Sequence, residues 1–395
     1  MIMMMMIMMM IMMMMMIHVV VLDALWFPRI RLPFFGRKDR SNTTSSIELS
    51  YNQYNGLKNL GNTCYINSIL QGLYHIPIFR DTILSTTFIN HSIGHSLQLI
   101  FQNLLDCNGY TIDPNVLISR LGIDTRVQED AQEFLLKLIN TLGESIENSN
   151  NKNIKDNEIV NSILNGELIN IIRCLNVEFR KERKQKFIDL SVDIDGYNTL
   201  DETLHHLFEP IIFEKDNQYK AGDYGLQDAI KSSSITSCPK VLVIHLKRFA
   251  FDMDTGNMRK INNKLDFPFL LNMTNYMENA SNILTQNDNS KVAIDDNDSN
   301  RISSRNDKNI YELKTVIVHE GNVNYGHYTC YAKVNDFKSK TKEKWIYLND
   351  HSVIDVDENH VIHNTYGGSS SASSSLSSSL SGFSKNAYIL FYQKV

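Results

Sequence analysis

One short stretch, from Gly56 to Gln71, constrains this chain more than any other. From Tyr65 onward the large apolar residues recur at i, i+3, i+4 and i+7, and they are Ile66, Ile69, Leu70 and Leu73. This spacing predicts a helix that buries one face. Asn62 and Thr63 are good capping residues just before it, and Pro77 comes where the helix should end. The prediction therefore places Cys64 at the helix N-terminus.

The position of Cys64 matters for its chemistry. Unpaired backbone N–H groups and the positive end of the helix dipole favour a thiolate over a thiol at a helix N-terminus. The alternative is that Cys64 is a small buried hydrophobic residue, the commonest fate of a free cysteine. Downstream, Tyr325–Tyr328 contains a histidine and Trp345–Asp350 contains groups that could orient it. Together they indicate a cysteine hydrolase.

The histidine lies in a predicted β-hairpin. Tyr311–Val318 is rich in β-branched and aromatic residues, His319–Asn322 has turn chemistry, and Tyr328–Val334 alternates again. His327 opens the second strand, where it is the candidate general base for Cys64. A lone histidine beside a glycine is more often structural, so this assignment depends on the wider pattern.

That wider pattern is a family resemblance. The string Gly-Leu-Lys-Asn-Leu-Gly-Asn-Thr-Cys-Tyr-Ile-Asn-Ser at 56–68 resembles the cysteine box of the ubiquitin-specific proteases almost residue for residue. Gly-His-Tyr followed by Trp-x-x-Leu-Asn-Asp resembles the family's histidine box. By this resemblance Cys64 is the nucleophile, His327 is the base, and Asn59 donates to the oxyanion. Removing one such donor typically costs about 3 kcal/mol of transition-state stabilisation.

Two neighbouring residues are candidates for orienting the histidine. The family carries Asp or Asn at the third catalytic position, which by resemblance is Asn349 here. A carboxamide fixes the tautomer and tilt of an imidazole, although it stabilises an imidazolium less than a carboxylate does. Asp350 is the second candidate, expected to assist through a water or a direct contact.

A further string, Val127–Leu136, concerns substrate recognition. Asp130 and Glu133 are three residues apart and share a face of a predicted helix, which is usually only a solvated face. The string resembles the family's Gln-x-Asp-Ala-x-Glu-Phe motif, whose acidic residues hold the arginines of the ubiquitin C-terminal tail. The resemblance adds four tail-binding candidates: Gln132, His319, Tyr328 and Tyr366. His319 is explained nearly as well as a surface turn residue.

Other matches give the predicted architecture. The start of the fingers is resembled by Arg173–Asn176 followed by Phe187–Val192. The strand returning to the palm is resembled by Pro239–Phe249, and the closing strand by Tyr388–Gln393. The resemblance implies an α+β, papain-like cysteine protease fold over residues 51–395. A helical thumb would span about 51–160, antiparallel β fingers about 161–245 and an antiparallel β palm about 246–395. The pattern is closest to the small members activated by WD-repeat partners.

The fingers depart from that pattern. The relatives carry two Cys-x-x-Cys pairs there, which fits a structural zinc site. Here Cys174 begins Cys-Leu-Asn-Val, and Tyr219–Tyr224 has no cysteine. One thiolate cannot make a tetrahedral site, so we predict no zinc and no other cofactor, with fingers that are held by packing or loose. Because the family's activators dock on the fingers, the loss also weakens the inference of a WD-repeat activator.

Composition bears on compartment and partners. The five cysteines are scattered and odd in number, which argues against a disulfide framework and favours a reducing compartment, cytoplasmic or nuclear. The formal net charge is -5 and there is no long basic run, so nothing indicates a nucleic-acid partner.

Residues 1–27 form a Met/Ile-rich extension, followed by a linker at 28–50. The extension is long enough to span a bilayer, and the basic residues after it would leave the rest of the chain in the cytosol. The other interpretation, which we favour slightly, is a low-complexity extension or a mis-chosen start codon, because a methionine run has no anchoring pattern. Asn148–Asn157, 278–309 and 367–384 predict disordered surface loops.

The sequence thus predicts a thiol-dependent deubiquitinase. It would hydrolyse the isopeptide or peptide bond at the C-terminal glycine of ubiquitin through an acyl-enzyme on Cys64, with ubiquitin and ubiquitylated proteins as partners. Two alternatives stay open. One is a catalytically weak ubiquitin-binding scaffold, motivated by the missing zinc ligands, and the other is a hydrolase for another ubiquitin-like modifier.

Overall fold

The computed structural model describes residues 54–106, 108–147, 163–277, 309–323, 325–335, 343–368 and 384–395. All of them belong to one of the two units into which the chain divides, Tyr51–Val395. The extension and linker predicted before residue 51 lie outside the described residues, as do nearly all residues of the three predicted loops. No helix in the described part of the chain is both long and apolar enough to cross a membrane.

The largest sheet in the described residues has eight strands. In order they are β17 (Ser352–Val356), β16 (Glu343–Asn349), β15 (Gly326–Asn335), β14 (Ile310–Gly321), β18 (Lys385–Lys394), β10 (Val241–Lys247) and β5 (Asp189–Asp193), with β13 (Leu270–Asn272) paired to the start of β14. Neighbours run antiparallel except β10 and β5. The middle strands are nearly continuous apolar runs because both of their faces are covered.

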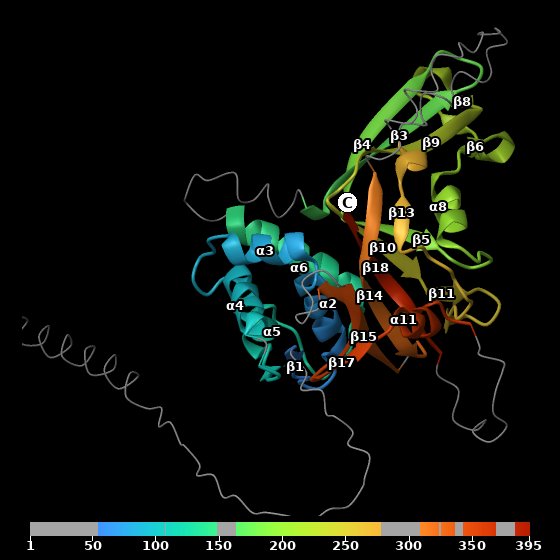
Figure 1. Cartoon of the computed structure of the whole chain (residues 1–395). Helices are drawn as coiled ribbons and strands as arrows, with labels where there is room; N and C mark the ends of the chain where they lie inside the picture. Colours follow the sequence, from blue (N-terminus) through green and yellow to red (C-terminus); the bar gives the residue numbers. More distant parts are fainter. Residues whose placement is uncertain are drawn as a thin grey trace, which may run out of the picture. The chain divides into compact units, whose positions relative to one another are not determined.

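Helices cover both faces of this sheet (Figure 1). On the first face lie α2 (Cys64–Tyr74), α3 (Pro77–Ser85), α4 (Ile93–Leu105), α5 (Asn115–Arg120) and α6 (Ala131–Glu147), and on the second lie α8 (Leu200–Phe208) and α11 (Glu358–Thr365). The buried apolar side chains on the two faces form two separate clusters, with Val243 in the first and its neighbour Leu242 in the second. Successive side chains of a strand point to opposite faces. This arrangement confirms the predicted α+β class.

Helix α2 confirms the prediction from apolar spacing, and all of its residues are buried. It contacts β14 and β15 on one side and α3 and α6 on the other. Gly72 allows the close approach to the sheet, because a Cβ there would lie 3.0 Å from Cδ1 of Ile317. The predicted capping is wrong. Thr63 occupies the N-cap position, but its hydroxyl accepts from the Leu60 N–H at 2.9 Å and donates to Asn59, so it stabilises the turn before the helix.

A second sheet corresponds to the predicted fingers. Its strands, in order, are β4 (Arg180–Phe187), β3 (Gly166–Cys174), β9 (Ala229–Ser237) and β6 (Ile211–Phe213), all antiparallel. Figure 1 shows it as the green strands that extend from one end of the large sheet. The predicted limits of 161–245 are wrong in detail, since β5 and β10 fall inside them and belong to the large sheet. The chain passes from the second sheet to the large sheet at β5, returns to the second sheet, and reaches the large sheet again at β10, so one continuous range cannot describe the fingers.

Short strand pairs complete the described fold. They are β1 (Gly56–Leu57) with β2 (Thr111–Ile112), β7 (Tyr219–Lys220) with β8 (Leu226–Gln227), and β11 (Phe249–Asp252) with β12 (Asn257–Lys260). The first pair holds the loop that precedes α2. The predicted hairpin is confirmed as β14 and β15, although β14 continues through the segment that was predicted as a turn.

Candidate active site

Cys64 is the first residue of α2 and is 3% exposed. The loop before it turns sharply at Gly61, whose φ of 135° favours glycine and where a Cβ would lie 2.7 Å from the carbonyl oxygen of Thr125. The Asn62 N–H donates to the same oxygen at 2.8 Å. The loop is therefore fixed against the segment that leads into α6. It holds the sulfur where the free N–H groups of the first helical turn create a positive potential.

His327 lies beside this sulfur, on β15. One ring nitrogen, Nε2, is 2.7 Å from Oδ1 of Asn349, which can only accept, so Nε2 carries a proton. The other ring nitrogen is left for the hydrogen bond between His327 and Cys64. The bond with Cys64, supported by that with Asn349 and by the charge of Asp350, raises the pKa of His327 from 6.5 to about 9 against the opposing effect of burial. His327 therefore stays protonated at neutral pH, the state that pairs with a thiolate.

Asp350 follows β16 and bonds to the segment that carries Cys64. Its φ of 48° makes a tight turn between β16 and β17, and its carbonyl oxygen accepts from the Leu57 N–H at 2.8 Å. Its carboxylate oxygens accept from Nδ2 of Asn59 at 2.9 Å and from Nδ2 of Asn67 at 2.8 Å. The carboxylate hydrogen bonds of Asp350 thus go to the cysteine box rather than directly to the histidine, its charge contributes to the raised pKa of His327, and assistance through a water stays a prediction.

Asn59 is held at both ends of its carboxamide. Its Oδ1 accepts from the N–H groups of Gly61 at 3.0 Å and Thr63 at 3.2 Å, and its Nδ2 donates to Asp350. The bond to Asp350 uses one of the two Nδ2 hydrogens. The geometry therefore fixes the orientation of the carboxamide at the base of the helix that carries Cys64, as an oxyanion donor requires.

Comparisons with known proteins identify the family. Residues 55–392 match the family model described as "Ubiquitin carboxyl-terminal hydrolase". This chain belongs to that hydrolase family. Among curated relatives, Ubiquitin C-terminal hydrolase 12 of Arabidopsis thaliana is 33% identical over 320 residues, which cover 79% of this chain and 26% of that protein. Ubiquitin carboxyl-terminal hydrolase 15 of Saccharomyces cerevisiae is 30% identical over 322 residues, which cover 80% of this chain and 24% of that protein. The chain spans about a quarter of the length of these relatives.

Gln128 is a residue of this hydrolase-family site that sequence reasoning missed. Its Nε2 donates to the Cys64 sulfur at 3.0 Å and to the carbonyl oxygen of Gly326 at 2.9 Å. The signal was available, since Gln128 belongs to the Gln-x-Asp-Ala-x-Glu-Phe string, but only the other polar residues of that string were weighed. It joins the nucleophile to the backbone of the residue before His327.

The acidic pair of that string does not share a helical face. Asp130 precedes α6 and caps it, with Oδ1 accepting from the N–H groups of Gln132 at 2.7 Å and Glu133 at 3.3 Å. Its other oxygen accepts from the hydroxyl of Tyr388. Glu133 is exposed in the first turn of α6. The prediction of a common face is therefore wrong, because Asp130 is used as a helix cap.

Gln132 bonds to a residue that lines a groove between α6 and the base of the fingers. Its Nε2 donates to Oδ2 of Asp189 at 3.3 Å, and Ser191 donates to the same oxygen at 2.8 Å. Asp189 belongs to the lining of a cavity of about 480 Å³, together with Leu136 and Asn140 from the next turns of α6. The groove places a carboxylate that the sequence prediction did not include next to a predicted tail-binding residue.

His319 and Tyr328 lie in an aromatic cluster with Phe249 and Tyr388. Their ring centroids are 4.8 Å apart, and their exposed fractions are only 3% and 4%. The surface-turn interpretation of His319 is wrong, because β14 continues to Gly321 and buries it. Burial, with the charges of Lys260 and His327, lowers the pKa of His319 to about 3, so this imidazole is neutral.

Tyr366 packs away from this group. Its hydroxyl donates to the carbonyl oxygen of Phe267 at 2.7 Å and its ring lies against the Phe267 ring, with centroids 4.6 Å apart. Both residues belong to the cluster on the second face of the large sheet. The structure thus does not bring Tyr366 to Cys64, whose side chain belongs to the first cluster.

Cys174 lies in a small apolar cluster of the fingers, which we call the fingertip. Cys174 is buried with Ala221 and Ala229, and partly buried apolar side chains pack around them, including Phe179 and Tyr219. No group of three or more His, Cys, Asp or Glu side chains that could hold a metal ion occurs in the described ranges. The donors present near Cys174 therefore do not fit a four-cysteine zinc site, and the absence of zinc stays a prediction.

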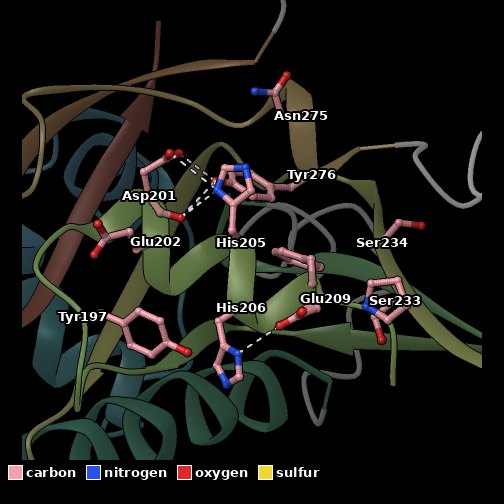
Figure 2. Close-up of a pocket in the computed structure, with 12 residues that line it drawn as sticks. Tyr197, Asp201, Glu202, His205, His206, Glu209, Ser233, Ser234, Asn275 and Tyr276 are labelled. Carbon is pink, nitrogen blue, oxygen red and sulfur yellow. Dashed lines mark hydrogen bonds and ion pairs between the residues drawn. The ribbon is translucent and has the colours of Figure 1, made fainter. Parts of the chain in front are cut away.

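Another cavity lies away from Cys64. It has a volume of about 750 Å³ and is lined by α8 and by residues of β9, with Tyr276 at one side. Figure 2 shows Tyr276 directed at Asp201 and His205, and its hydroxyl donates to Oδ1 of Asp201 at 2.8 Å and lies 3.0 Å from Nδ1 of His205. Because α8 covers the second face of the large sheet, this cavity is separated from Cys64 by the sheet.

Proposed function

We propose that this chain is a cysteine-dependent deubiquitinase that hydrolyses the isopeptide or peptide bond at the C-terminal glycine of ubiquitin. One observation carries the proposal. The imidazole of His327 interacts with the Cys64 sulfur and bonds to Oδ1 of Asn349 at 2.7 Å, although Cys64 lies far from these two residues in the sequence. Membership of the ubiquitin carboxyl-terminal hydrolase family supports ubiquitin as the modifier.

In the acylation step, the Cys64 thiolate attacks the carbonyl carbon of the terminal glycine. A C–S bond forms and the carbonyl oxygen becomes an oxyanion, which the remaining Nδ2 hydrogen of Asn59 and the free N–H groups of the first turn of α2 would stabilise. His327, already protonated, gives its proton to the leaving amine as the C–N bond breaks. The products are the free lysine amine and a thioester on Cys64.

In the deacylation step, neutral His327 takes a proton from a water molecule that attacks the thioester carbonyl. The C–S bond then breaks, the C-terminal carboxylic acid of ubiquitin loses its remaining proton to solvent as ubiquitin leaves, and the thiolate faces a protonated imidazole again. Asn349 keeps Nε2–H of His327 engaged throughout, so the other nitrogen always faces the reacting atoms. A neutral carboxamide suits this task because the thiolate itself balances the imidazolium charge.

Recognition of the ubiquitin tail would use the groove beside α6. The tail carries arginines, and we infer that they would pair with two carboxylates, those of the exposed Glu133 and the groove-lining Asp189. Asp130, with both oxygens engaged, would act by holding the start of α6. The fingers would contact the modifier without a bound metal, with their own structure stabilised by the packing around Cys174.

The test is turnover of ubiquitin with a C-terminal aminomethylcoumarin. We expect the wild-type chain to release the fluorophore and Cys64→Ala to release none while keeping its thermal unfolding midpoint. Unchanged turnover in Cys64→Ala would end the proposal. A chain that binds ubiquitin without any turnover would support the scaffold alternative. Selective turnover of the coumarin derivative of another ubiquitin-like modifier would support a hydrolase for that modifier.

A further inference from the structure

Gln128 occupies a position that the mechanism above does not use. It lies in the segment just before α6, is partly buried, and extends its carboxamide between two other elements. The Nε2 atom carries two hydrogens, and both are engaged, one with the Cys64 sulfur at 3.0 Å and one with the Gly326 carbonyl at 2.9 Å. The carboxamide therefore connects α2 to the start of β15.

The two partners of Gln128 are the nucleophile and the residue next to the base. Gly326 precedes His327 directly, and the absence of a side chain there is required, because a Cβ would lie 1.9 Å from Nε2 of His319. The start of β15 is thus packed from one face by His319 and held from the thumb by Gln128. A movement of either contact would change the separation of Cys64 and His327.

We propose that Gln128 is a positioning residue that stabilises the thiolate of Cys64 and sets its distance from His327. The inference rests on the proposed role of Cys64 as the nucleophile. A thiol sulfur is a weak acceptor, whereas a charged acceptor forms a stronger hydrogen bond, so an N–H aimed at the sulfur favours the thiolate. With both hydrogens engaged, Gln128 is distinct from Asn59, whose carboxamide is fixed by its own loop and keeps one hydrogen for the oxyanion.

Other charged and titratable groups also face the reacting pair. They are Asp350 after β16, His319 on β14, Tyr328 on β15, and Tyr65 on α2 with its neighbour Glu129. All of them are retained when only Gln128 is changed. A shift in the pH dependence of Cys64 reactivity can therefore be assigned to the lost N–H donor.

The experiment measures alkylation of Cys64 by iodoacetamide between pH 4 and pH 9, quantified on the Cys64 peptide by mass spectrometry. Gln128→Met keeps the length of the side chain and removes both donors. We expect the pH at half-maximal rate to rise by about one unit and the rate at pH 6 to fall about tenfold, with an unchanged plateau at high pH. Gln128→Glu should move the midpoint further, because a carboxylate opposes the thiolate.

Turnover of the fluorogenic ubiquitin substrate gives a second readout. A positioning role predicts a lower kcat at neutral pH with KM unchanged in Gln128→Met. Gln102→Met, which removes an exposed carboxamide on α4, is the matched control and should alter neither the alkylation profile nor kcat. If Gln128→Met does not fold, Gln128→Glu provides the same comparison with a side chain of the same shape.

The inference is overturned if Gln128→Met and Gln128→Glu both alkylate with the wild-type pH profile. It is also overturned if Gln102→Met reproduces the shift. Alkylation needs no ubiquitin, so this failure is separate from failure of the proposed function. A wild-type chain that alkylates at low pH in a Gln128-dependent way but turns over no modifier would support the inference and contradict the proposed function.

Discussion

Replacing Asp350 by asparagine tests whether this residue acts through Asn59 or on His327. In the wild type its two carboxylate oxygens accept from Asn59 at 2.9 Å and from Asn67 at 2.8 Å. An asparagine keeps one acceptor and turns the other atom into a donor, which would face another N–H group. The φ of 48° adds little strain, because asparagine tolerates the left-handed region.

The magnitude follows from these contacts. A hydrogen bond to a charged acceptor contributes about 1.5–3 kcal/mol, and Asn67 is only 2% exposed, so water does not replace a lost partner. We expect Asp350→Asn to lower the free energy of unfolding by about 2–3 kcal/mol. Loss of a correctly placed oxyanion donor costs about 10²–10³ in kcat, so kcat should fall about 100-fold.

The assays are denaturant unfolding and turnover of the fluorogenic ubiquitin substrate. Asn67→Ser is the matched control, because it removes one bond to Asp350 and leaves Asn59 in place. It should lose stability with a much smaller loss of kcat. The reasoning is refuted if Asp350→Asn loses stability yet keeps wild-type kcat, or if Asn67→Ser loses as much kcat as Asp350→Asn.

Three further predictions concern the base, its charge and the fingers. Asn349→Ala removes the partner of Nε2 and should lower kcat about 100-fold with KM unchanged, whereas Asn349→Asp, which also accepts, should retain most activity; equal losses would contradict this. The pKa of His327 is raised from 6.5 to about 9, so it contributes stability that is complete below about pH 6.5 and lost as pH rises through about 9. Urea unfolding should therefore show a larger fall in unfolding free energy between pH 7 and pH 10 in the wild type than in His327→Gln, and parallel curves would count against it. Excess EDTA should leave the thermal midpoint unchanged while Phe179→Ser lowers it, and release of zinc with a drop in the midpoint would reverse the argument about the fingertip.

Local regularities were predictable from the sequence. The apolar spacing from Ile66 to Leu73 matches the period of a helix, and α2 forms there because the sheet and two helices cover it on all sides. The alternation of residue types along Tyr328–Val334, after His327, likewise predicts the second strand of the hairpin. The prediction that Thr63 caps α2 through its side chain is wrong, because its hydroxyl can bond to several neighbouring groups. Thr63 bonds to Leu60 and Asn59, a choice that depends on the shape of the loop.

Long-range contacts between side chains were not predictable in the same way. The pairing of Cys64 with His327 came from the family resemblance, since no periodicity relates positions so far apart. The bond of Gln128 to the sulfur and the use of Asp130 as a helix cap depend on where α6 begins relative to β15 and β18. Single residues in such contacts carry no local pattern that sequence reasoning could weigh.

The central claim is that the sulfur of Cys64 attacks the C-terminal carbonyl of ubiquitin with help from His327. Its most direct test is reaction with ubiquitin propargylamide, followed by peptide mapping of the adduct by mass spectrometry. The account predicts a single adduct on Cys64 that is lost in Cys64→Ala and greatly slowed in His327→Ala. An adduct on another cysteine, or none with a folded wild-type chain, would contradict it.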